Sequence, residues 1–247
     1  MLFIIFLTGL FFGSFFNVLI YRLPLNKSII LPSSYCPNCE TKLKYYDLIP
    51  VLSYISTKGK CRYCGEKISL RYPIVELLTA LLFLLAFLKY GLNAEFIIML
   101  ILISSLIVVS FIDLKHQIIP NEITFSLIPL GLVMSVFLNH ISFINSLLGL
   151  VIPAGLLLLI AFIYKKGMGI GDVKLIGMIG VFVGWKYALI SIFIGSLLGS
   201  IYGIFMMATD KMSRKTRIPF GPFISSGAVI MILWGDFLIN WYINIFL

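Results

Sequence analysis

The chain has 247 residues, of which 60% are hydrophobic, with only 19 basic and 10 acidic side chains. Its mean hydropathy of +1.07 excludes a soluble globular domain, because such domains average about 45–50% apolar and 25% charged residues. The apolar residues form unbroken runs instead of alternating, so a membrane β-barrel fits poorly and an all-α integral membrane protein is predicted. The net charge of +9 is then explained by basic residues on cytoplasmic loops, and no nucleic-acid partner is expected.

Eight apolar runs predict about eight transmembrane helices, since a membrane helix needs about 20 residues. The first run, 2–19, is followed rather than preceded by its first basic residue, Arg22, which indicates a membrane span and not a signal peptide. Seven further runs lie at 73–88, 96–112, 123–138, 144–164, 173–184, 187–208 and 223–246. The chain is therefore divided into a first span at 1–21, one polar loop at 22–72 and a seven-span domain at 73–247.

The positions of the basic residues predict the orientation. Nine of the 19 Lys and Arg residues lie in the loop 22–72, against three acids, so this loop is expected in the cytoplasm and the N-terminus outside. On this topology, 17 of the 19 basic residues face the cytoplasm and only Lys89 and Lys186 do not. The run 173–184 is short and interrupted by glycines, and it is expected to be a broken or partly inserted helix that lines a cavity.

All four cysteines lie in the loop, as two CxxC pairs separated by 21 residues: Cys36 and Cys39, then Cys61 and Cys64. This is the ligand spacing of a tetrahedral four-thiolate zinc site, although the spacer is slightly longer than usual. The alternative is a pair of disulfides, which the reducing cytoplasm disfavours. Four protein ligands leave no open position for a substrate, so the predicted zinc is structural and supplies folding free energy to a loop with few large apolar groups.

Four acidic residues lie within or at the ends of apolar runs, where a carboxylate is expensive and therefore a functional candidate: Glu76, Asp113, Asp172 and Asp236. On the predicted topology, Asp113 ends the third span and Asp172 opens the sixth, which places both near the cytoplasmic face. Two carboxyls that share a proton supply a general base and a general acid, as in aspartic proteases. The competing interpretation makes each aspartate an interface anchor, paired with Lys115 or His116 in one case and with Lys174 in the other.

The remaining marked residues have weaker signals. Glu76 lies near the start of its span, where capping by the helix dipole competes evenly with a functional role. A structural hydrogen bond is favoured for Asp236, and His116 and His140 are interpreted as residues of the membrane interface.

Five stretches occur in a fixed order and form a specific set: 13–18 with 22–24, the two CxxC pairs, 69–76, 112–120 and 167–174. The last contains Gly169-Ile170-Gly171-Asp172. Together they resemble the type IV prepilin peptidases, membrane aspartic proteases of the GxGD group. The resemblance implies that Asp113 and Asp172 are the catalytic pair. It also implies a bacterial inner-membrane enzyme, active near the cytoplasmic face.

The resemblance further implies the substrates and a second activity. Prepilin or pseudopilin precursors lose a short basic leader after a glycine, and the new N-terminal residue is then methylated with S-adenosylmethionine as methyl donor. Many members carry Asp where this chain has Asn121, which lies outside the catalytic pair. Nothing in the loop resembles a Gly-rich nucleotide site, so the methyl donor rests on the resemblance alone and its binding residues are unknown.

Two other classes of protein compete with a peptidase. A proton-coupled transporter would use the two aspartates as a relay, but it predicts discontinuous segments in two similar halves, and only one Gly-interrupted run is present. A non-enzymatic scaffold with the zinc loop as a docking module leaves both aspartates unexplained. The sequence does not distinguish substrates for pili, secretion or DNA uptake, and it gives no oligomeric state.

Overall fold

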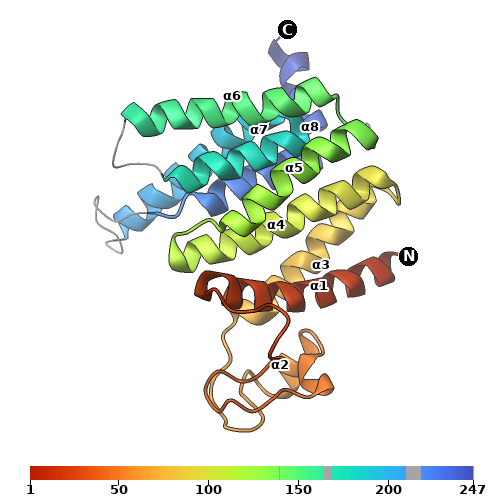
Figure 1. The fold of residues 1–247 in the computed structure, drawn as a ribbon, viewed down its shortest axis with the longest axis vertical. Helices are drawn as coiled ribbons and strands as arrows, with labels where there is room; N and C mark the ends of the chain where they lie inside the picture. The colour runs from red at the N-terminus through yellow and green to blue at the C-terminus, as the bar shows by residue number, and fades with distance from the viewer. Residues whose placement is uncertain (139, 164–168, 210–217, 247) are drawn as a thin grey trace. The chain divides into compact units, whose positions relative to one another are not determined.

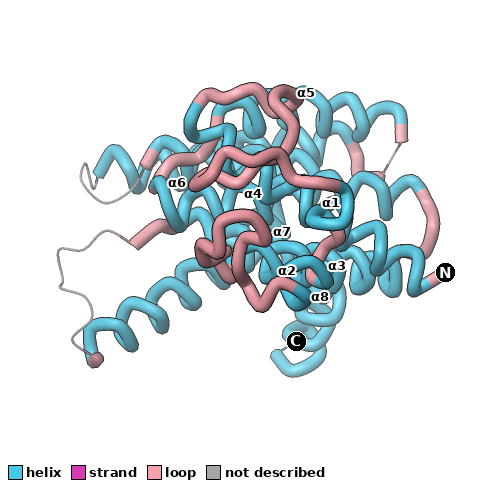
Figure 2. The backbone as a smooth tube through the Cα atoms, turned by 90° about the horizontal axis from the view of Figure 1, so that it is seen from below, coloured by secondary structure: helices cyan, strands magenta, loops and turns pink. Residues whose placement is uncertain are grey.

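The computed structural model describes residues 1–138, 140–163, 169–209 and 218–246. Within these ranges the regular elements are helices, with isolated β-bridges but no strand (Figure 2). Six of the described helices are long and apolar enough to cross a membrane, and one further apolar helix is shorter. The predicted class, an all-α multi-pass membrane protein, is confirmed.

The contacts divide the chain into two compact units, Met1–Leu92 and Asn93–Leu247. This grouping differs from the segments drawn from the sequence, because the second long helix packs on the first. The predicted segments 1–21, 22–72 and 73–247 concern membrane topology and stay a prediction.

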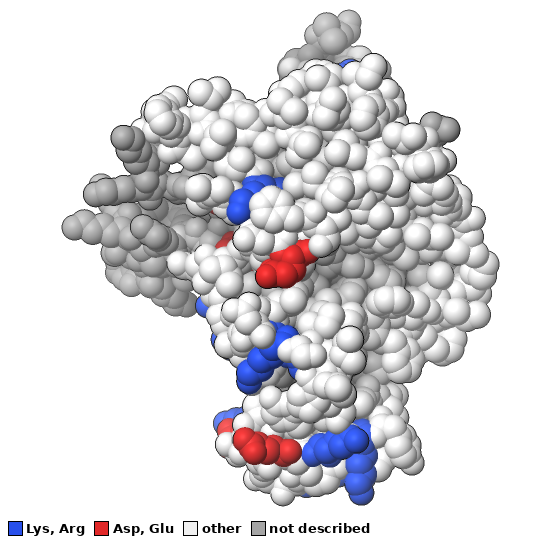
Figure 3. All heavy atoms as spheres, in the orientation of Figure 1, with Lys and Arg blue, Asp and Glu red and all other residues white. Residues whose placement is uncertain are grey.

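The first unit consists of two long helices and the polar loop between them. The helices α1 and α3 lie side by side (Figure 1), and the loop holds the short elements η1, η2 and α2. The bounds are α1 Leu2–Arg22, η1 Leu23–Leu25, η2 Tyr45–Leu48, α2 Leu52–Ser56 and α3 Arg71–Tyr90. Charged side chains gather over this loop on the face drawn in Figure 3, whereas the helical surface there is mostly uncharged. An uncharged helical surface is what contact with lipid requires.

In its described residues, the second unit is a bundle of five helices. Helix α7 packs against α5, α6 and α8, and α4 packs against α8. The bounds are α4 Ala94–His116, α5 Asn121–Phe137, α6 Phe143–Ile163, α7 Ile170–Ala208 and α8 Gly221–Phe246. Its core includes many fully buried apolar side chains on α4, the first half of α7 and α8: Ile98, Leu102, Ile103, Leu106, Ile112, Leu175, Ile176, Met178, Ile179, Phe182, Ile224, Ala228, Met231 and Ile232.

Helix α7 is broken at Gly184. This residue has φ 81° and ψ 167°, a backbone conformation that is open essentially to glycine alone. The two halves on either side correspond to the predicted runs 173–184 and 187–208, so each of the eight apolar runs has a helical counterpart. The break lies at the end of the run 173–184, and Gly177 and Gly180 within it are helical, so the expectation that glycines interrupt this run is met only at Gly184. Partial insertion beside a cavity stays a prediction.

Candidate active site and cysteine cluster

Asp113 lies in the last turn of α4 and is 5% exposed. Its Oδ2 accepts a buried hydrogen bond of 3.0 Å from the backbone N–H of Gly221, the first residue of α8. A Cβ atom added to Gly221 would lie 2.7 Å from that oxygen, so only glycine permits the approach. The N–H groups at a helix N-terminus favour a bound anion. The N-terminus of α8 therefore supports a negative charge on Asp113.

The sequence did not predict Gly221 as a site residue. The available signal was Gly221 followed by Pro222 just before an apolar run, since proline at the start of a helix marks its N-terminus. That signal predicts a helix start, but it does not say which carboxylate the start will meet. The partner lies 108 residues away in the sequence.

Asp172 lies in the first turn of α7, behind the N-cap Gly169, and is 8% exposed. Its backbone N–H donates to the Gly169 carbonyl oxygen at 3.1 Å, while Gly169 and Ile170 themselves are exposed. The turn thus buries the carboxyl beside an accessible stretch of backbone. Gly167 and Met168, which complete the sequence motif, lie outside the described residues.

The fold brings the two aspartates together, although 58 residues of helix and loop separate them, and their carboxyl groups are close enough for a direct electrostatic interaction. Neither makes an ion pair within the described part of the chain. Lys174, the expected partner of Asp172 in the anchor interpretation, instead donates to Asn121 Oδ1 at 2.9 Å. Two buried carboxyls that interact electrostatically, with no cation paired to either in the described part of the chain, form a pair in which one carboxyl favours the protonated state of the other.

The four cysteines form a compact cluster. Their sulfur atoms all lie within 4.8 Å of one another, and the thiols are free. Cys36 Sγ and Cys64 Sγ are 4.0 Å apart, twice the length of about 2.05 Å that a disulfide requires. Four cysteine sulfurs at such distances are a donor set suited to a soft or borderline metal such as zinc.

The two CxxC pairs have matching turns. Glu40 N–H donates to the Cys36 carbonyl oxygen, and Gly65 N–H donates to the Cys61 carbonyl oxygen, both at 2.9 Å. Burial raises the pKa of Cys36 to about 11, whereas hydrogen bonds from the Thr41 hydroxyl and backbone lower the pKa of Cys39 to about 6. Metal binding requires the thiolate form. The thiols therefore differ in how readily they become ligands.

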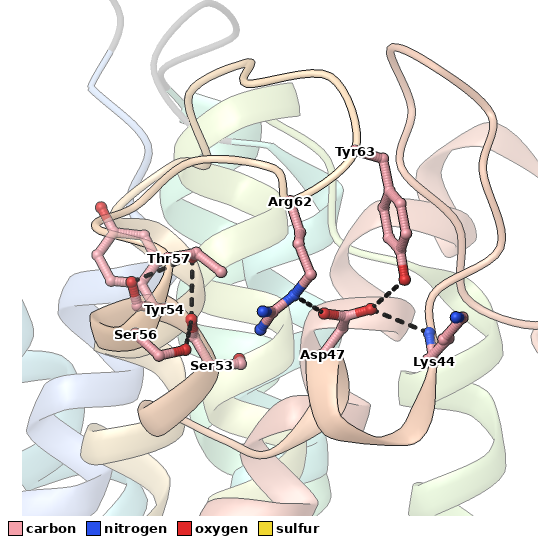
Figure 4. Close-up of polar contacts among 8 residues, drawn as sticks. All are labelled: Lys44, Asp47, Ser53, Tyr54, Ser56, Thr57, Arg62 and Tyr63. Carbon is pink, nitrogen blue, oxygen red and sulfur yellow. Dashed lines mark hydrogen bonds and ion pairs between the residues drawn. The ribbon is translucent and has the colours of Figure 1, made fainter.

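Asp47, on η2, forms contacts with the second CxxC turn of the same loop (Figure 4). Its carboxylate accepts hydrogen bonds from Arg62 Nε at 2.9 Å, from the Tyr63 hydroxyl at 2.7 Å and from Lys44 N–H at 3.1 Å. Burial opposes the charged form, but the hydrogen bonds from Tyr63 and Arg62 outweigh it and hold the pKa of Asp47 below its ordinary value. Arg62 and Tyr63 lie between the second pair of cysteines, so Asp47 helps fix that turn.

Glu76 does not cap α3. It lies beyond the first turn, is 6% exposed, and its Oε2 accepts a hydrogen bond of 2.8 Å from Val51 N–H in the loop. The capping interpretation is wrong because a tertiary contact engages the carboxylate instead. Asp236 accepts a hydrogen bond from the Tyr187 hydroxyl, as a structural role predicts. The interfacial interpretation of His116 and His140 stays a prediction.

Comparisons with known proteins cover both units. Residues 7–90 match the model of the bacterial peptidase A24 N-terminal domain, and residues 100–204 match that of the type IV leader peptidase family. Several relatives bear the name prepilin leader peptidase/N-methyltransferase, and three of them are compared next. The one from Bacillus subtilis is 37% identical over 99% of this chain and 98% of its own length. That from Legionella pneumophila is 34% identical over 94% and 91%, and that from Pseudomonas aeruginosa is 33% identical over 96% and 92%.

No solved structure matches this chain significantly. The sequence relatives span nearly its whole length at identities above 30%, and the two family models match successive parts of it. The chain therefore belongs to the type IV leader peptidase family.

Proposed function

We propose that this protein is a membrane aspartic endopeptidase that removes the short basic leader of prepilin-like precursors after a glycine and methylates the new N-terminal residue. The names of its nearly full-length relatives support both activities. The observation that carries the peptidase assignment is the pair of buried, electrostatically interacting carboxyls of Asp113 and Asp172.

The two carboxyls divide the acid and base work. Asp113 accepts the Gly221 N–H, and a hydrogen bond to the charged form favours that form, so Asp113 is the ionised base. It takes a proton from the attacking water as the water oxygen bonds to the scissile carbonyl carbon. Asp172 protonates the carbonyl oxygen. As the C–N bond breaks, the proton held by Asp113 passes to the leaving nitrogen, and a hydroxyl of the tetrahedral intermediate returns its proton to Asp172.

The substrate class follows from the family together with the charge distribution. The precursors are prepilins or pseudopilins, and the enzyme lies in the bacterial inner membrane with the aspartate pair near the cytoplasmic face. A basic loop does not attract a basic leader. Leader charge is therefore expected to hold the precursor near anionic lipid instead of pairing with the enzyme.

The cysteine cluster fits a structural zinc ion. Cys36, Cys39, Cys61 and Cys64 would supply all four ligands, which leaves no open position for substrate. The ion would provide cross-links in a loop with little apolar core and takes no part in proteolysis. S-adenosylmethionine is the methyl donor and enters as a second substrate.

A single assay tests both activities. Purified protein is incubated with a prepilin and S-adenosylmethionine, and the product is read by mass spectrometry. Loss of the leader and gain of one methyl group are separate mass changes. An intact prepilin after incubation with inserted wild-type protein would overturn the peptidase assignment and revive the proton-relay transporter, which no relative supports.

A further inference from the structure

A second buried polar site lies in the first unit, where α1 crosses α3. A Cβ atom added to Gly13 would lie 2.6 Å from Glu76 Cα, so the two backbones nearly touch there. Asn17 follows Gly13 by one helical turn and is 2% exposed, while Glu76 is 6% exposed. An amide and a carboxylate therefore face the same helix crossing.

The side-chain oxygens of Asn17 and Glu76 can each accept further hydrogen bonds. Asn17 Nδ2 donates to the carbonyl oxygens of Gly13 and Tyr72, at 3.2 and 3.1 Å, but its buried Oδ1 has no partner among the described residues. Glu76 has one N–H partner, Val51, and the Ser14 hydroxyl within hydrogen-bonding reach, and no cation pairs with it in the described ranges. A buried carboxylate and a buried carbonyl oxygen in this state leave acceptor positions that a donor ligand can occupy.

The loop holds this site in a strained geometry. Val51 has φ 62° and ψ −50°, an outlier for a β-branched residue, and this conformation directs its N–H to Glu76. The start of the loop is fixed by Arg22, which is 5% exposed and donates to the carbonyl oxygens of Ser28 and Pro32. Strain of this kind persists where surrounding structure imposes it, and it concentrates at ligand sites.

The side-chain oxygens of Asn17 and Glu76 indicate which kind of ligand fits the site. The site offers acceptors and a negative charge, so it suits a compact cation with several N–H donors. We propose that Asn17 and Glu76 bind the α-ammonium group of the processed substrate for methylation. This inference rests on the proposed function and gives the second activity a site in the other unit from the aspartate pair.

The proposed step balances as a simple transfer. Glu76 accepts a proton from the ammonium, while Asn17 Oδ1 holds a remaining N–H. The freed lone pair on nitrogen bonds to the methyl carbon of S-adenosylmethionine, and the carbon–sulfur bond breaks with its electron pair going to sulfur. The sulfonium becomes a neutral thioether. The methylated nitrogen, now a secondary ammonium, releases its proton to water.

The first test measures binding and needs no turnover. A synthetic peptide with the sequence of a processed prepilin N-terminus is compared with the same peptide acetylated at its α-amine. The wild-type protein is expected to bind the free-amine peptide at least about tenfold more tightly, a difference of about 1.4 kcal/mol. Equal binding would overturn the proposal. Equally tight binding of an acetylated peptide that carries a lysine side chain would overturn the choice of the α-amine.

The second test removes the charge and keeps the shape. Glu76→Gln retains an acceptor for Val51 N–H, so the loop contact survives. Methylation of the already processed peptide is expected to fall roughly 10²- to 10⁴-fold, the usual value of a general base. The preference for the free amine should disappear, while leader removal stays near the wild-type rate. Glu66→Gln, an exposed residue of the same unit, is the matched control and should change none of these.

Normal methylation by Glu76→Gln would overturn the proposal. If Glu76→Gln fails to insert, Glu76→Asp is used instead because it keeps the charge. It should bind the free-amine peptide better than the acetylated one. Equal binding of the two peptides by inserted Glu76→Asp would contradict the proposed site. Wild-type protein that neither cleaves nor methylates would refute the proposed function itself, which is a different result from a wild type that methylates without using Glu76.

Discussion

The cysteine cluster and the aspartate pair are built in opposite ways. Each cysteine pair is held by short backbone turns whose hydrogen bonds span four or five residues, and contacts within the same polar loop, such as Asn38 Nδ2 to Cys64 Sγ, join the two pairs. The aspartates are placed by three long helices, and the closest partner of Asp113 comes from a residue 108 positions away. Local turns without an apolar core depend on a metal for their stability, whereas a pair held between buried helices depends on packing. Metal removal should therefore disrupt the cysteine cluster and not the aspartate pair, and substitution of an aspartate should have the opposite effect.

The largest effect is expected from Asp113→Asn and Asp172→Asn. An amide matches the carboxylate in shape but cannot exchange the proton, so each variant should lose roughly 10²- to 10⁴-fold or more in the rate of leader removal. Because the pair acts as a unit, the double variant should be little worse than either single one. Mass spectrometry measures cleavage, and metal analysis of the same samples should show an unchanged zinc content.

A control separates the pair from other membrane acids. Asp236→Asn removes a carboxylate that accepts a hydrogen bond from Tyr187, so it is expected to lower stability and retain cleavage. Near-normal leader removal by either variant of the pair would return Asp113 and Asp172 to a structural or proton-relay role.

Gly221→Ala should be the next largest effect on cleavage. The added methyl group would lie 2.7 Å from Asp113 Oδ2, so the carboxyl or the start of α8 must move. A displacement on this scale is expected to slow leader removal roughly 10- to 100-fold. Gly155→Ala is the matched control, since no atom lies within 4 Å of a Cβ at that position. Equal rates for the two variants would show that the Gly221 contact does not orient the base.

Metal removal should affect the loop more than the peptidase. Replacement of the four cysteines by serine, or chelation, is expected to abolish binding of about one zinc ion per chain. Hydrogen exchange should then rise in the loop, while leader removal stays within a few-fold of the wild-type rate because the aspartates belong to the helical bundle. Elemental analysis and exchange mass spectrometry measure the two outcomes. A zinc-loaded wild type that loses all cleavage on chelation would show that the two sites are coupled.

The smallest effect is expected from Asp47→Asn. The pKa of Asp47 is lowered in the folded loop, so the charged form stabilises the fold fully above its ordinary pKa of 3.8. That contribution is lost as pH falls through the lower folded value. Amide exchange in the loop should therefore be faster in the variant than in the wild type at neutral pH, and the difference should vanish in strong acid. A difference that persists in acid would assign the role to something other than the charge.

The sequence predicted what depends on composition and short spacing. Unbroken apolar runs determined the helices, and the CxxC spacing determined the cysteine cluster, since both patterns act over a few residues. Of the glycines in the run 173–184, only Gly184 at its end breaks the helix, whereas Gly177 and Gly180 are helical. The two aspartates were expected at one depth from the alternation of spans, a global argument that needed only the basic residues.

What the sequence did not predict depends on contacts between distant segments. No sequence pattern near Glu76 predicts that the backbone N–H of Val51 donates a hydrogen bond to it. Its position near the start of α3 favoured the interpretation as a helix cap instead. The Gly221 contact was missed for the same reason, because a glycine before a helix is compatible with many partners. Likewise, Lys174 seemed suited to Asp172 by proximity in sequence, but the start of α5 supplies Asn121 as its acceptor.

The most direct test of the central claim is one leader-removal assay on three proteins, each verified as inserted: the wild type, Asp172→Asn, and the variant with serine at all four cysteine positions. A product without its leader is expected from the wild type and from the cysteine-free variant, and unprocessed precursor is expected from Asp172→Asn. Cleavage by Asp172→Asn at the wild-type rate would contradict the assignment of proteolysis to the aspartate pair. So would a result in which the cysteine-free variant fails to cleave while Asp172→Asn still cleaves.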